Sequence, residues 1–347
     1  MNEIALVMRE VVKRFGAATA LDRFTLDVRS GELLALVGPS GSGKSTALHT
    51  IVGLHDPDAG EITLHGNGLV GVAPGARDVA MVWQDGALYP HLTVHDNLAF
   101  PLKARGKWGE KAVTHMAERL DLLDLLDRLP GELSGGERQR TALGRALIRK
   151  PKLFLLDEPL SSLDLPLRER LRTLIRELVR ETSVTTVYVT HDQAEAMAVG
   201  DRVAVIRAGR VVQAATPREI YEKPVHEFVA RFFGNPPMNL LDGCIEDGHV
   251  VGEWGRLAID GGENGRTVRV GFRPEHAAIT GEPTGLAATL RRVEYQGHET
   301  IAMLLARDAE LRLRLPDGEA LPNIGDDANL RIDRGNLHLF SADGARL

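Results

Sequence analysis

The sequence has little cysteine, no long hydrophobic run and no excess of basic residues. Its 347 residues include one cysteine, Cys244, which excludes an internal disulfide and fits a reducing compartment. No apolar stretch approaches the roughly 18 residues that a membrane-spanning helix requires, and the amino terminus lacks the basic region and apolar core of a secretory signal. We therefore expect any role at a membrane to be exercised through a protein partner.

Positive charge is also scarce. The formal net charge of -6 argues against a nucleic-acid-binding groove, so no nucleic-acid partner is expected. With 43% hydrophobic and 26% charged residues, the composition is that of an ordinary globular protein. The chain is long enough for a large core and for two domains.

What the sequence does contain is a glycine-rich loop between an apolar strand, predicted over 33–37, and a helix, predicted over 46–52 and ended by Gly53. The loop fits the pattern G-x-x-x-x-G-K-[ST]. Backbone N–H groups of such a loop converge on phosphate oxygens, and the helix N-terminus adds its positive dipole end. The predicted phosphate-binding residues are Gly38, Pro39, Ser40, Gly41, Ser42, Gly43, Lys44, Ser45 and Thr46.

Within this loop two side chains have distinct expected roles. Lys44 is placed to reach the β and γ phosphates, and Ser45 to offer its hydroxyl to Mg²⁺. Two adjacent carboxylates, Asp157 and Glu158, follow a second apolar strand. Such a pair is in isolation more often a helix N-cap. Because this chain also carries a phosphate loop, we favour a catalytic interpretation of the pair. In it, Asp157 holds Mg²⁺ through water and Glu158 polarises the attacking water.

Single polar residues follow two further predicted strands, where α/β folds place groups that sense a ligand. Gln84 comes after the strand at 79–83, and His191 after the strand at 185–189. On the residues alone, His191 is either a donor to a γ-phosphate or a capping or exposed residue. Phe15 is likewise either a stacking surface for a purine or a core or strand-end residue.

An all-helical insert, from about residue 88 to 150, interrupts the α/β pattern. Apolar residues at helical spacing predict one helix from Glu110 to Leu129. Ser134 and Glu137 form a capping box, so the next helix is predicted to begin there, with glycines 135 and 136 in its first turn. Two glycines in that turn cost roughly 1 kcal/mol each relative to alanine. The cost makes sense if something approaches this backbone closely.

The pattern changes near residue 235. The stretch 235–239 contains two prolines and is the predicted linker. Beyond it come short alternating strands with turn glycines and little helix signal, which predict a separate all-β domain of the small-barrel type. The predicted domains are therefore residues 1–235, α/β, and residues 236–347, which contain no catalytic constellation that we identify.

With these pieces in order, the first 235 or so residues resemble the ATP-binding-cassette (ABC) ATPases. Five motifs match in sequence order: the Walker A loop at 38–46, the Q-loop at Gln84, the LSGGQ signature at 133–137 with glutamate last, Walker B at 153–158 and the switch histidine at His191. In addition, the loop at 161–164 is similar to the D-loop. The resemblance implies an α/β P-loop NTPase cassette: a RecA-like core with an antiparallel β-subdomain and a helical subdomain at about 88–150, followed by a small all-β OB-like domain.

A narrower resemblance, to the ATPases of bacterial carbohydrate importers of the maltose and glycerol-phosphate type, rests on residues 87–94 and 271–276. Importers of iron, sulfate or polyamines share the layout but more often carry phenylalanine where Tyr89 stands. The family also attaches a C-terminal β-domain of the transport-associated OB kind. Two departures stand out: Trp83 replaces a usual phenylalanine, and Phe15 stands where many relatives have an adenine-stacking tyrosine.

The resemblance implies an ATP-hydrolysing importer subunit, peripheral on the cytoplasmic face of the inner membrane. Its implied catalytic residues are Glu158, His191 and Gln84, and its implied Mg²⁺ ligands are Ser45, Gln84 and Asp157. ATP is contacted by the loop and Phe15 and, across a two-fold dimer, by Ser134, Gly135, Gly136 and Asp164. The implied partners are permease subunits near Gln84 and the helical insert, a second copy of the chain, indirectly a solute-binding protein, and a regulatory protein at the β-domain.

Two alternatives belong to other classes of protein. A non-transport ABC ATPase working on DNA or ribosomes tends to carry tandem cassettes, coiled coils or basic surfaces, and this sequence shows none. A sugar-responsive regulator whose ATPase has lapsed is disfavoured by the intact Lys44, Asp157 and Glu158.

Overall fold

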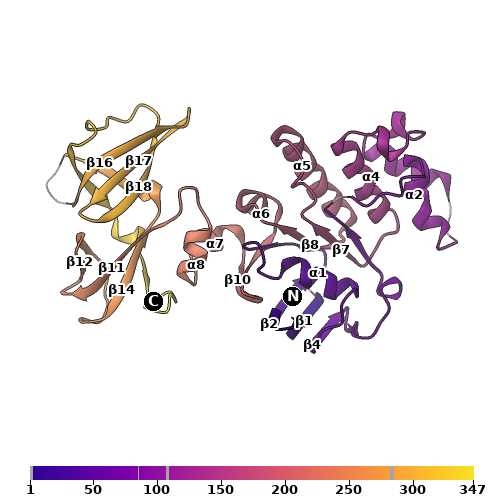
Figure 1. Ribbon diagram of the computed structural model, residues 1–347, viewed down its shortest axis with the longest axis horizontal. Helices are drawn as coiled ribbons and strands as arrows, with labels where there is room; N and C mark the ends of the chain where they lie inside the picture. Colours follow the sequence, from indigo (N-terminus) through magenta and orange to yellow (C-terminus); the bar gives the residue numbers. More distant parts are fainter. Residues whose placement is uncertain (1–2, 85, 107–108, 282–284) are drawn as a thin grey trace. The chain divides into compact units, whose positions relative to one another are not determined.

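A computed structural model describes residues 3–84, 86–106, 109–281 and 285–347. Contacts divide the chain into two compact units, Met1–Pro217 and Arg218–Leu347 (Figure 1). Among the helices of these described ranges, none is both long and apolar enough to cross a membrane.

The first unit is built on a six-stranded sheet of order β10-β9-β3-β8-β7-β6. All neighbours pair in parallel except β9 and β10, which form a hairpin. The strands are β3 (Leu33–Val37), β6 (Val79–Val82), β7 (Leu153–Asp157), β8 (Thr185–Thr190), β9 (Arg202–Arg207) and β10 (Arg210–Ala215). Every residue of β3, β7 and β8 is buried, as expected for parallel strands covered on both faces. The predicted apolar strands are thus confirmed.

Two layers cover this sheet. The helices α5 (Leu165–Thr182) and α6 (Gln193–Val199) lie on one side of the sheet. On the other side, α1 (Lys44–Val52) lies between it and an antiparallel sheet of order β2-β1-β4-β5 (Figure 1). That second sheet comprises β1 (Ile4–Phe15), β2 (Ala18–Arg29), β4 (Ala59–Leu64) and β5 (Asn67–Gly68), and a single 3₁₀ turn, η1 (Pro74–Ala76), follows it. Alternate residues of β2, among them Phe24, Leu26 and Val28, are buried in the core shared with α1, as expected for an antiparallel strand with one face exposed to solvent.

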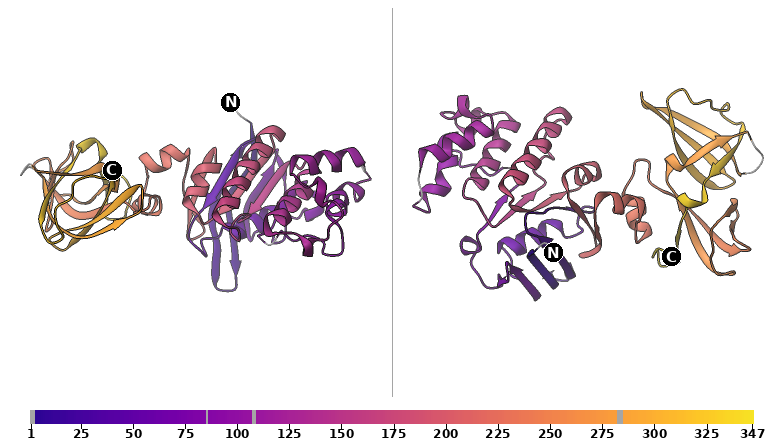
Figure 2. Two further views of the ribbon diagram at one scale, coloured as in Figure 1. Left: turned by 90° about the horizontal axis from the view of Figure 1, so that it is seen from above. Right: turned by 180° about the vertical axis from the view of Figure 1, so that it is seen from behind.

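The helical insert gathers α2 (Val94–Lys103), α3 (Glu110–Arg119) and α4 (Gly135–Leu147) beside the β6 edge of the sheet (Figure 2). The predicted helix from 110 to 129 was wrong: α3 ends at Arg119, and the turns η2 (Leu123–Leu125) and η3 (Pro130–Glu132) follow. Asp121 adopts the left-handed conformation with φ 53°, and Leu122 N–H donates to the carbonyl of Ala117 at 2.8 Å. The apolar spacing therefore continues past a point where the chain has turned.

Helix starts follow local chemistry in this insert. The Thr93 hydroxyl accepts from Asp96 N–H at 3.1 Å and begins α2. At the start of α4, the Ser134 hydroxyl accepts from Glu137 N–H at 3.4 Å, and the Glu137 carboxylate accepts from Ser134 N–H at 2.7 Å. The capping box predicted at Ser134 is confirmed.

The second unit contains two five-stranded antiparallel sheets that share one core. One sheet has the order β13-β12-β11-β14-β20 and the other β15-β19-β16-β17-β18, which confirms the predicted all-β character. The strands are β11 (Asn239–Glu246), β12 (His249–Gly252), β13 (Gly255–Ala258), β14 (Thr267–Phe272), β15 (Ala277–Thr280), β16 (Leu286–Tyr295), β17 (Glu299–Ala306), β18 (Ala309–Pro316), β19 (Asp327–Ile332) and β20 (His338–Phe340), with turns η4 (Pro274–His276) and η5 (Arg334–Asn336).

Arg273, directly after β14, fastens two short helices to this unit. Its buried guanidinium donates to the carbonyls of Tyr221 and Ala230, at 2.8 and 2.9 Å, and to that of Phe233. These carbonyls lie at the ends of α7 (Pro217–Glu222) and α8 (Glu227–Phe232). The contact division consequently falls between Pro217 and Arg218, earlier in the chain than the linker predicted at residue 235.

Candidate nucleotide-binding site

The loop between β3 and α1 curls in a way that only glycine permits at two positions. Gly43 has φ 106°, and a Cβ there would lie 2.5 Å from the carbonyl oxygen of Ala20. A Cβ on Gly38 would lie 2.3 Å from the carbonyl oxygen of Ile206. Since real Cβ atoms do not approach backbone so closely, larger residues at either position would open the loop.

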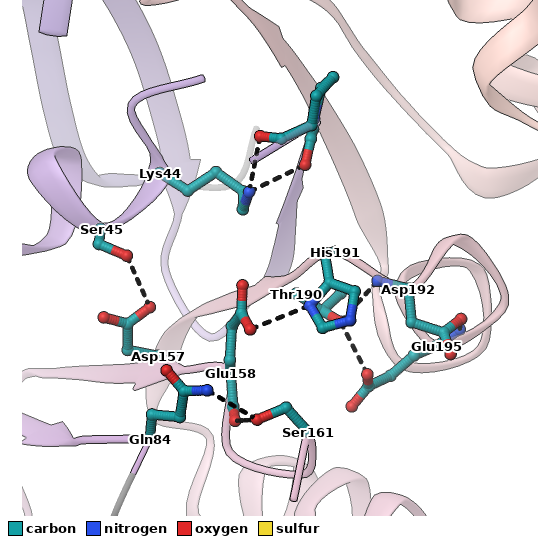
Figure 3. A network of polar contacts seen from close by, with 12 residues as sticks. Lys44, Ser45, Gln84, Asp157, Glu158, Ser161, Thr190, His191, Asp192 and Glu195 are labelled. Carbon is teal, nitrogen blue, oxygen red and sulfur yellow. Dashed lines mark hydrogen bonds and ion pairs between the residues drawn. The ribbon is translucent and has the colours of Figure 1, made fainter. Parts of the chain in front are cut away.

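Lys44 lies inside this curl. Its Nζ donates to the carbonyls of Gly38 and Pro39 at 2.8 and 3.0 Å (Figure 3). Burial lowers the pKa of Lys44, while the nearby charges of Glu158 and Asp157 act in the opposite direction. A cavity of about 260 Å³ opens beside the ammonium group, lined by Ala20, Ser40, Gly41, Gly43, Lys44, Ser45, Thr46 and Glu158. The fold thus brings the loop and one of the paired carboxylates to the same cavity.

Two oxygen donors meet at the edge of this cavity. Ser45 Oγ donates to Asp157 Oδ1 at 3.2 Å, and Asp157 is only 8% exposed at the end of β7. Burial raises the pKa of Asp157, and the Ser45 hydrogen bond opposes the rise. Mg²⁺ in nucleotide sites takes one or two protein oxygens and completes its shell with phosphate and water. This pair fits that requirement, and within the described ranges no group of three or more His, Cys, Asp or Glu side chains forms a protein-only metal site.

Glu158 is turned toward the next strand by an uncommon backbone conformation. It has φ 46°, in the left-handed region, and its N–H donates to the carbonyl of Val189 at 3.0 Å. Because β7 and β8 are parallel neighbours, their carboxyl ends meet, and His191 Nδ1 lies 2.9 Å from Glu158 Oε2 (Figure 3). The predicted base and the predicted switch histidine are therefore paired.

Gln84 reaches the same turn through Ser161, the first residue of the loop that resembles the D-loop. Its Nε2 donates to Ser161 Oγ at 3.2 Å, and Ser161 Oγ donates to the carbonyl of Glu158 at 3.0 Å. In this arrangement the Gln84 amide bonds to the Glu158 turn rather than to Ser45 or Asp157, the other predicted Mg²⁺ ligands.

Comparison with known proteins places these features in a family. Residues 21–161 match the family described as ABC transporter, residues 234–277 the MalK OB fold domain and residues 270–340 the TOBE domain. The chain is 50% identical over 287 residues to the trehalose/maltose import ATP-binding protein MalK of Thermococcus litoralis, which covers 77% of each chain. It is 44% identical over 353 residues to the sn-glycerol-3-phosphate import ATP-binding protein UgpC of Cereibacter sphaeroides, covering 100% of this chain and 99% of the relative. The alpha-glucoside transport ATP-binding protein AglK of Rhizobium meliloti is 40% identical over 358 residues, covering 98% of each.

The chain belongs to the ATP-binding subunits of ABC transporters. Its fold class, a cassette followed by a C-terminal all-β OB and TOBE region, is confirmed. Membership means that the chain binds ATP and couples ATP hydrolysis to transport, with membrane permeases as partners and peripheral association with the membrane.

Phe15 lies at the end of β1 in this ABC subunit and is 46% exposed. The His55 ring meets it edge-on, with centroids 5.1 Å apart, and Lys13 Nζ lies 5.5 Å from its centroid. The side chain is thus an exposed aromatic surface, which suits the predicted purine contact.

The signature residues stand apart from the cavity of their own chain. Ser134 caps α4, and Asp164 caps α5 by accepting from Leu167 N–H at 3.1 Å. Neither lines the cavity around Lys44. A Cβ on Gly135 would lie 3.3 Å from Leu163 Cδ2, and a Cβ on Gly136 would lie 2.6 Å from Leu167 Cδ2. The close approach that the two glycines indicated is therefore made, at least in part, by α5 of the same chain.

His49 is a site residue that the sequence reasoning missed. Its Nε2 lies 3.9 Å from Asp157 Oδ2, and its ring lies 5.3 Å from that of Trp83, the residue before Gln84. Burial lowers the pKa of His49. The sequence could have indicated His49, because it follows Ser45 by one helical turn and therefore lies on the same face of α1.

Proposed function

We propose that this chain is the ATP-hydrolysing subunit of a bacterial ABC importer for a sugar, polyol or glycerol-phosphate-type solute, peripheral on the cytoplasmic face of the inner membrane. The single observation that carries the ATPase role is that Lys44, Ser45 and Glu158 line one cavity, with Asp157 hydrogen-bonded to Ser45 and His191 hydrogen-bonded to Glu158. The names of the relatives, which include trehalose/maltose, glycerol-3-phosphate and alpha-glucoside transporters, support the solute class.

In this proposal the loop 38–46 holds the triphosphate. Its backbone N–H groups and the α1 N-terminus bind phosphate oxygens, and Lys44 exchanges its bonds to the carbonyls of Gly38 and Pro39 for bonds to the β and γ phosphates. Ser45, Asp157 and Gln84 would hold Mg²⁺, which when bound neutralises charge on those phosphates. Phe15 would stack on the adenine.

Glu158 and His191 divide the hydrolytic work. The Glu158 carboxylate orients and polarises the attacking water, and His191 Nδ1 holds that carboxylate at 2.9 Å. The imidazole ring then presents Nε2 toward the γ-phosphate.

The remaining predicted contacts, residues 134–136 and Asp164, act in trans in this proposal. They sit at the N-termini of α4 and α5 and do not line the cavity of their own chain. A helix N-terminus binds anions through free N–H groups and the helix dipole. In a two-fold dimer of this chain they would meet the γ-phosphate held by the partner, so that ATP binds the dimer together.

A groove on the helical insert is the proposed permease contact. It has a volume of about 300 Å³ and includes Tyr89, Phe100, Arg105, Arg145 and Arg149. The Tyr89 and Phe100 rings lie 4.6 Å apart and are 37% and 42% exposed, and the Arg145 guanidinium lies 5.1 Å from the Tyr89 centroid. Such a groove suits a permease segment with one apolar anchor and one acidic residue. The β-domain is assigned protein contacts, either with a second copy or with a regulatory partner.

Co-purification followed by reconstitution tests the proposal. The chain would be isolated with the membrane subunits that bind it, placed in vesicles, and assayed for ATP-dependent uptake of maltose, glycerol 3-phosphate, sulfate and spermidine. We expect uptake of one of the first two solutes, abolished by Glu158→Gln. Uptake of sulfate or spermidine alone would refute the solute class, and absence of any membrane subunit would refute the transport role.

A further inference from the structure

Glu195 is a buried carboxylate that none of the assigned roles uses. It lies at the third position of α6, is 5% exposed, and both its carboxylate oxygens accept hydrogen bonds from hydroxyl groups. Thr190 Oγ1 donates to Glu195 Oε2 at 2.7 Å, and Tyr188 OH donates to Glu195 Oε1. Burying a carboxylate is costly, so a position that is held only to fill space would favour an apolar side chain.

The hydrogen bonds of Glu195 form a closed ring around the His191 backbone. Thr190 Oγ1 donates to Glu195 and accepts from Asp192 N–H at 3.0 Å, so the orientation of its hydroxyl is fixed. Asp192 Oδ1 in turn accepts from Glu195 N–H at 3.0 Å. The residues immediately before and after His191 are therefore both bonded into the ring (Figure 3).

His191 itself has little packing to hold it. Its side chain is 57% exposed, against 21% for Glu158. The direction of an exposed imidazole depends on where its backbone places Cβ and on the few polar contacts that it makes. Here the backbone is fixed by Glu195, and the ring makes a polar contact with Glu158.

We propose that Glu195 is a positioning residue that holds His191 against Glu158 by way of Thr190 and Asp192. The inference rests on the proposed function for the catalytic meaning of that pair. Hydrogen bonds inside a buried network strengthen one another. The ring therefore holds the backbone at the end of β8 in one conformation. Loss of the Glu195 carboxylate frees the Thr190 hydroxyl to rotate, and the His191 turn loses its fixed geometry.

Four variants separate positioning from general stabilisation. Glu195→Met removes both acceptors, and Thr190→Val removes the hydroxyl that links them to Asp192. Thr190→Ser keeps that hydroxyl and is the rescue. Thr186→Val is the matched control, because Thr186 is a buried threonine on the same strand whose hydroxyl bonds to the carbonyl of Val184, at 3.0 Å. If Glu195→Met does not fold, the two Thr190 variants decide the question.

The first measurement needs no nucleotide. Two-bond ¹H–¹⁵N spectra of the imidazole rings, with His191 assigned through His191→Gln, report its hydrogen bond to Glu158. We expect the His191 signals to shift or broaden in Glu195→Met and Thr190→Val, and to match the parent in Thr190→Ser and Thr186→Val. Unchanged His191 signals in both of the first two variants would overturn the proposal.

The second measurement is ATP turnover. Misplacement of a catalytic group costs about 10- to 100-fold, so kcat should fall by that factor in Thr190→Val while KM for ATP stays near the parent value. In a His191→Gln background the same substitution should cost less than about twofold, because coupled residues are not additive. An equal loss in both backgrounds would show a merely structural role. Parent-level turnover in His191→Gln would refute the catalytic assignment of His191, whereas the ring signals would still decide whether Glu195 positions it.

Discussion

Nδ1 of His191 lies 2.9 Å from Oε2 of Glu158, although the two residues are separated by an entire helix and strand. The contact exists because β7 and β8 are parallel neighbours whose carboxyl ends project the following turns to the same place. Glu158 adds a left-handed backbone conformation with φ 46°, which turns its side chain toward β8. Sheet topology thus brings the proposed base and its partner together.

Replacing Glu158 with glutamine should stop turnover and leave ATP binding intact. The carboxylate polarises water but does not hold the triphosphate, so kcat should fall by about 100-fold or more. Gel filtration with Mg-ATP should show the variant as an ATP-bound dimer. Glu169→Gln, at an exposed position of α5, is the control and should elute and turn over as the parent does. Hydrolysis at the parent rate by Glu158→Gln would remove the residue from the mechanism.

Ser134 should act on the nucleotide of a partner chain, so two inactive variants should complement each other. Ser134→Arg blocks the signature turn and Lys44→Ala removes the phosphate-binding ammonium, and each alone should lack activity. A mixture contains dimers with one intact composite site, whose ATPase activity should exceed that of either variant by several-fold. A mixture no more active than its components would contradict the trans assignment.

The β-domain should lose stability as pH falls below about 6.5, because His338 is buried in its neutral form. Burial, followed by the charges of Arg346 and Arg273, lowers the pKa of His338 to about 4. The unfolded chain, with a histidine pKa near 6.5, binds more protons between these values, so its free energy falls relative to the folded state as pH decreases. The difference between the folded and unfolded pKa values of His338 corresponds to about 3 kcal/mol in the free energy of unfolding.

Thermal unfolding of the full chain at pH 7, 5.5 and 4.5 checks this expectation. His338→Phe should flatten the pH dependence of the β-domain transition, because phenylalanine has no proton to gain. The control is His298→Gln, at a side chain that is 82% exposed, and it should follow the parent curve. Parallel curves for His338→Phe and the parent would contradict the assignment.

Residues 236–347 should be dispensable for ATP chemistry, since every cassette motif is complete by His191. A chain ending after Pro217 should keep Mg-dependent nucleotide binding within about threefold of the parent, with weaker dimerisation. A chain ending at residue 235 keeps α7 and α8 but lacks Arg273, which bonds the carbonyls of Ala230 and Phe233. That second chain should expose those helices and aggregate more readily. Loss of nucleotide binding by a chain that remains folded in circular dichroism would place part of the ATP site in the tail.

Features set by local chemistry were predictable from the sequence. The glycine loop, the cap at Ser134 and the buried parallel strands each depend on neighbouring residues, and each was confirmed. The helix predicted to Leu129 failed because apolar spacing does not reveal the left-handed turn at Asp121.

Contacts between distant elements were not predictable in the same way. To predict the ring that joins Thr190 to Glu195, one must know the direction that α6 takes after β8. To predict the hydrogen bonds of Arg273, one must know the positions of two helices some forty to fifty residues earlier in the chain. The contact of His49 with Trp83 is an intermediate case. The sequence shows which face of α1 carries His49, but it does not show that Trp83 lies against that face.

The packing of α5 on the signature turn has a consequence for how a dimer closes. Leu163 and Leu167 lie against Gly135 and Gly136, so the caps of two helices, Ser134 and Asp164, are mechanically joined. In the proposed dimer, neither cap could approach a partner's phosphate while the other stays behind. Engagement across the dimer is therefore expected to be all-or-none at each site, and an intermediate with the signature turn seated and the D-loop withdrawn should not be populated.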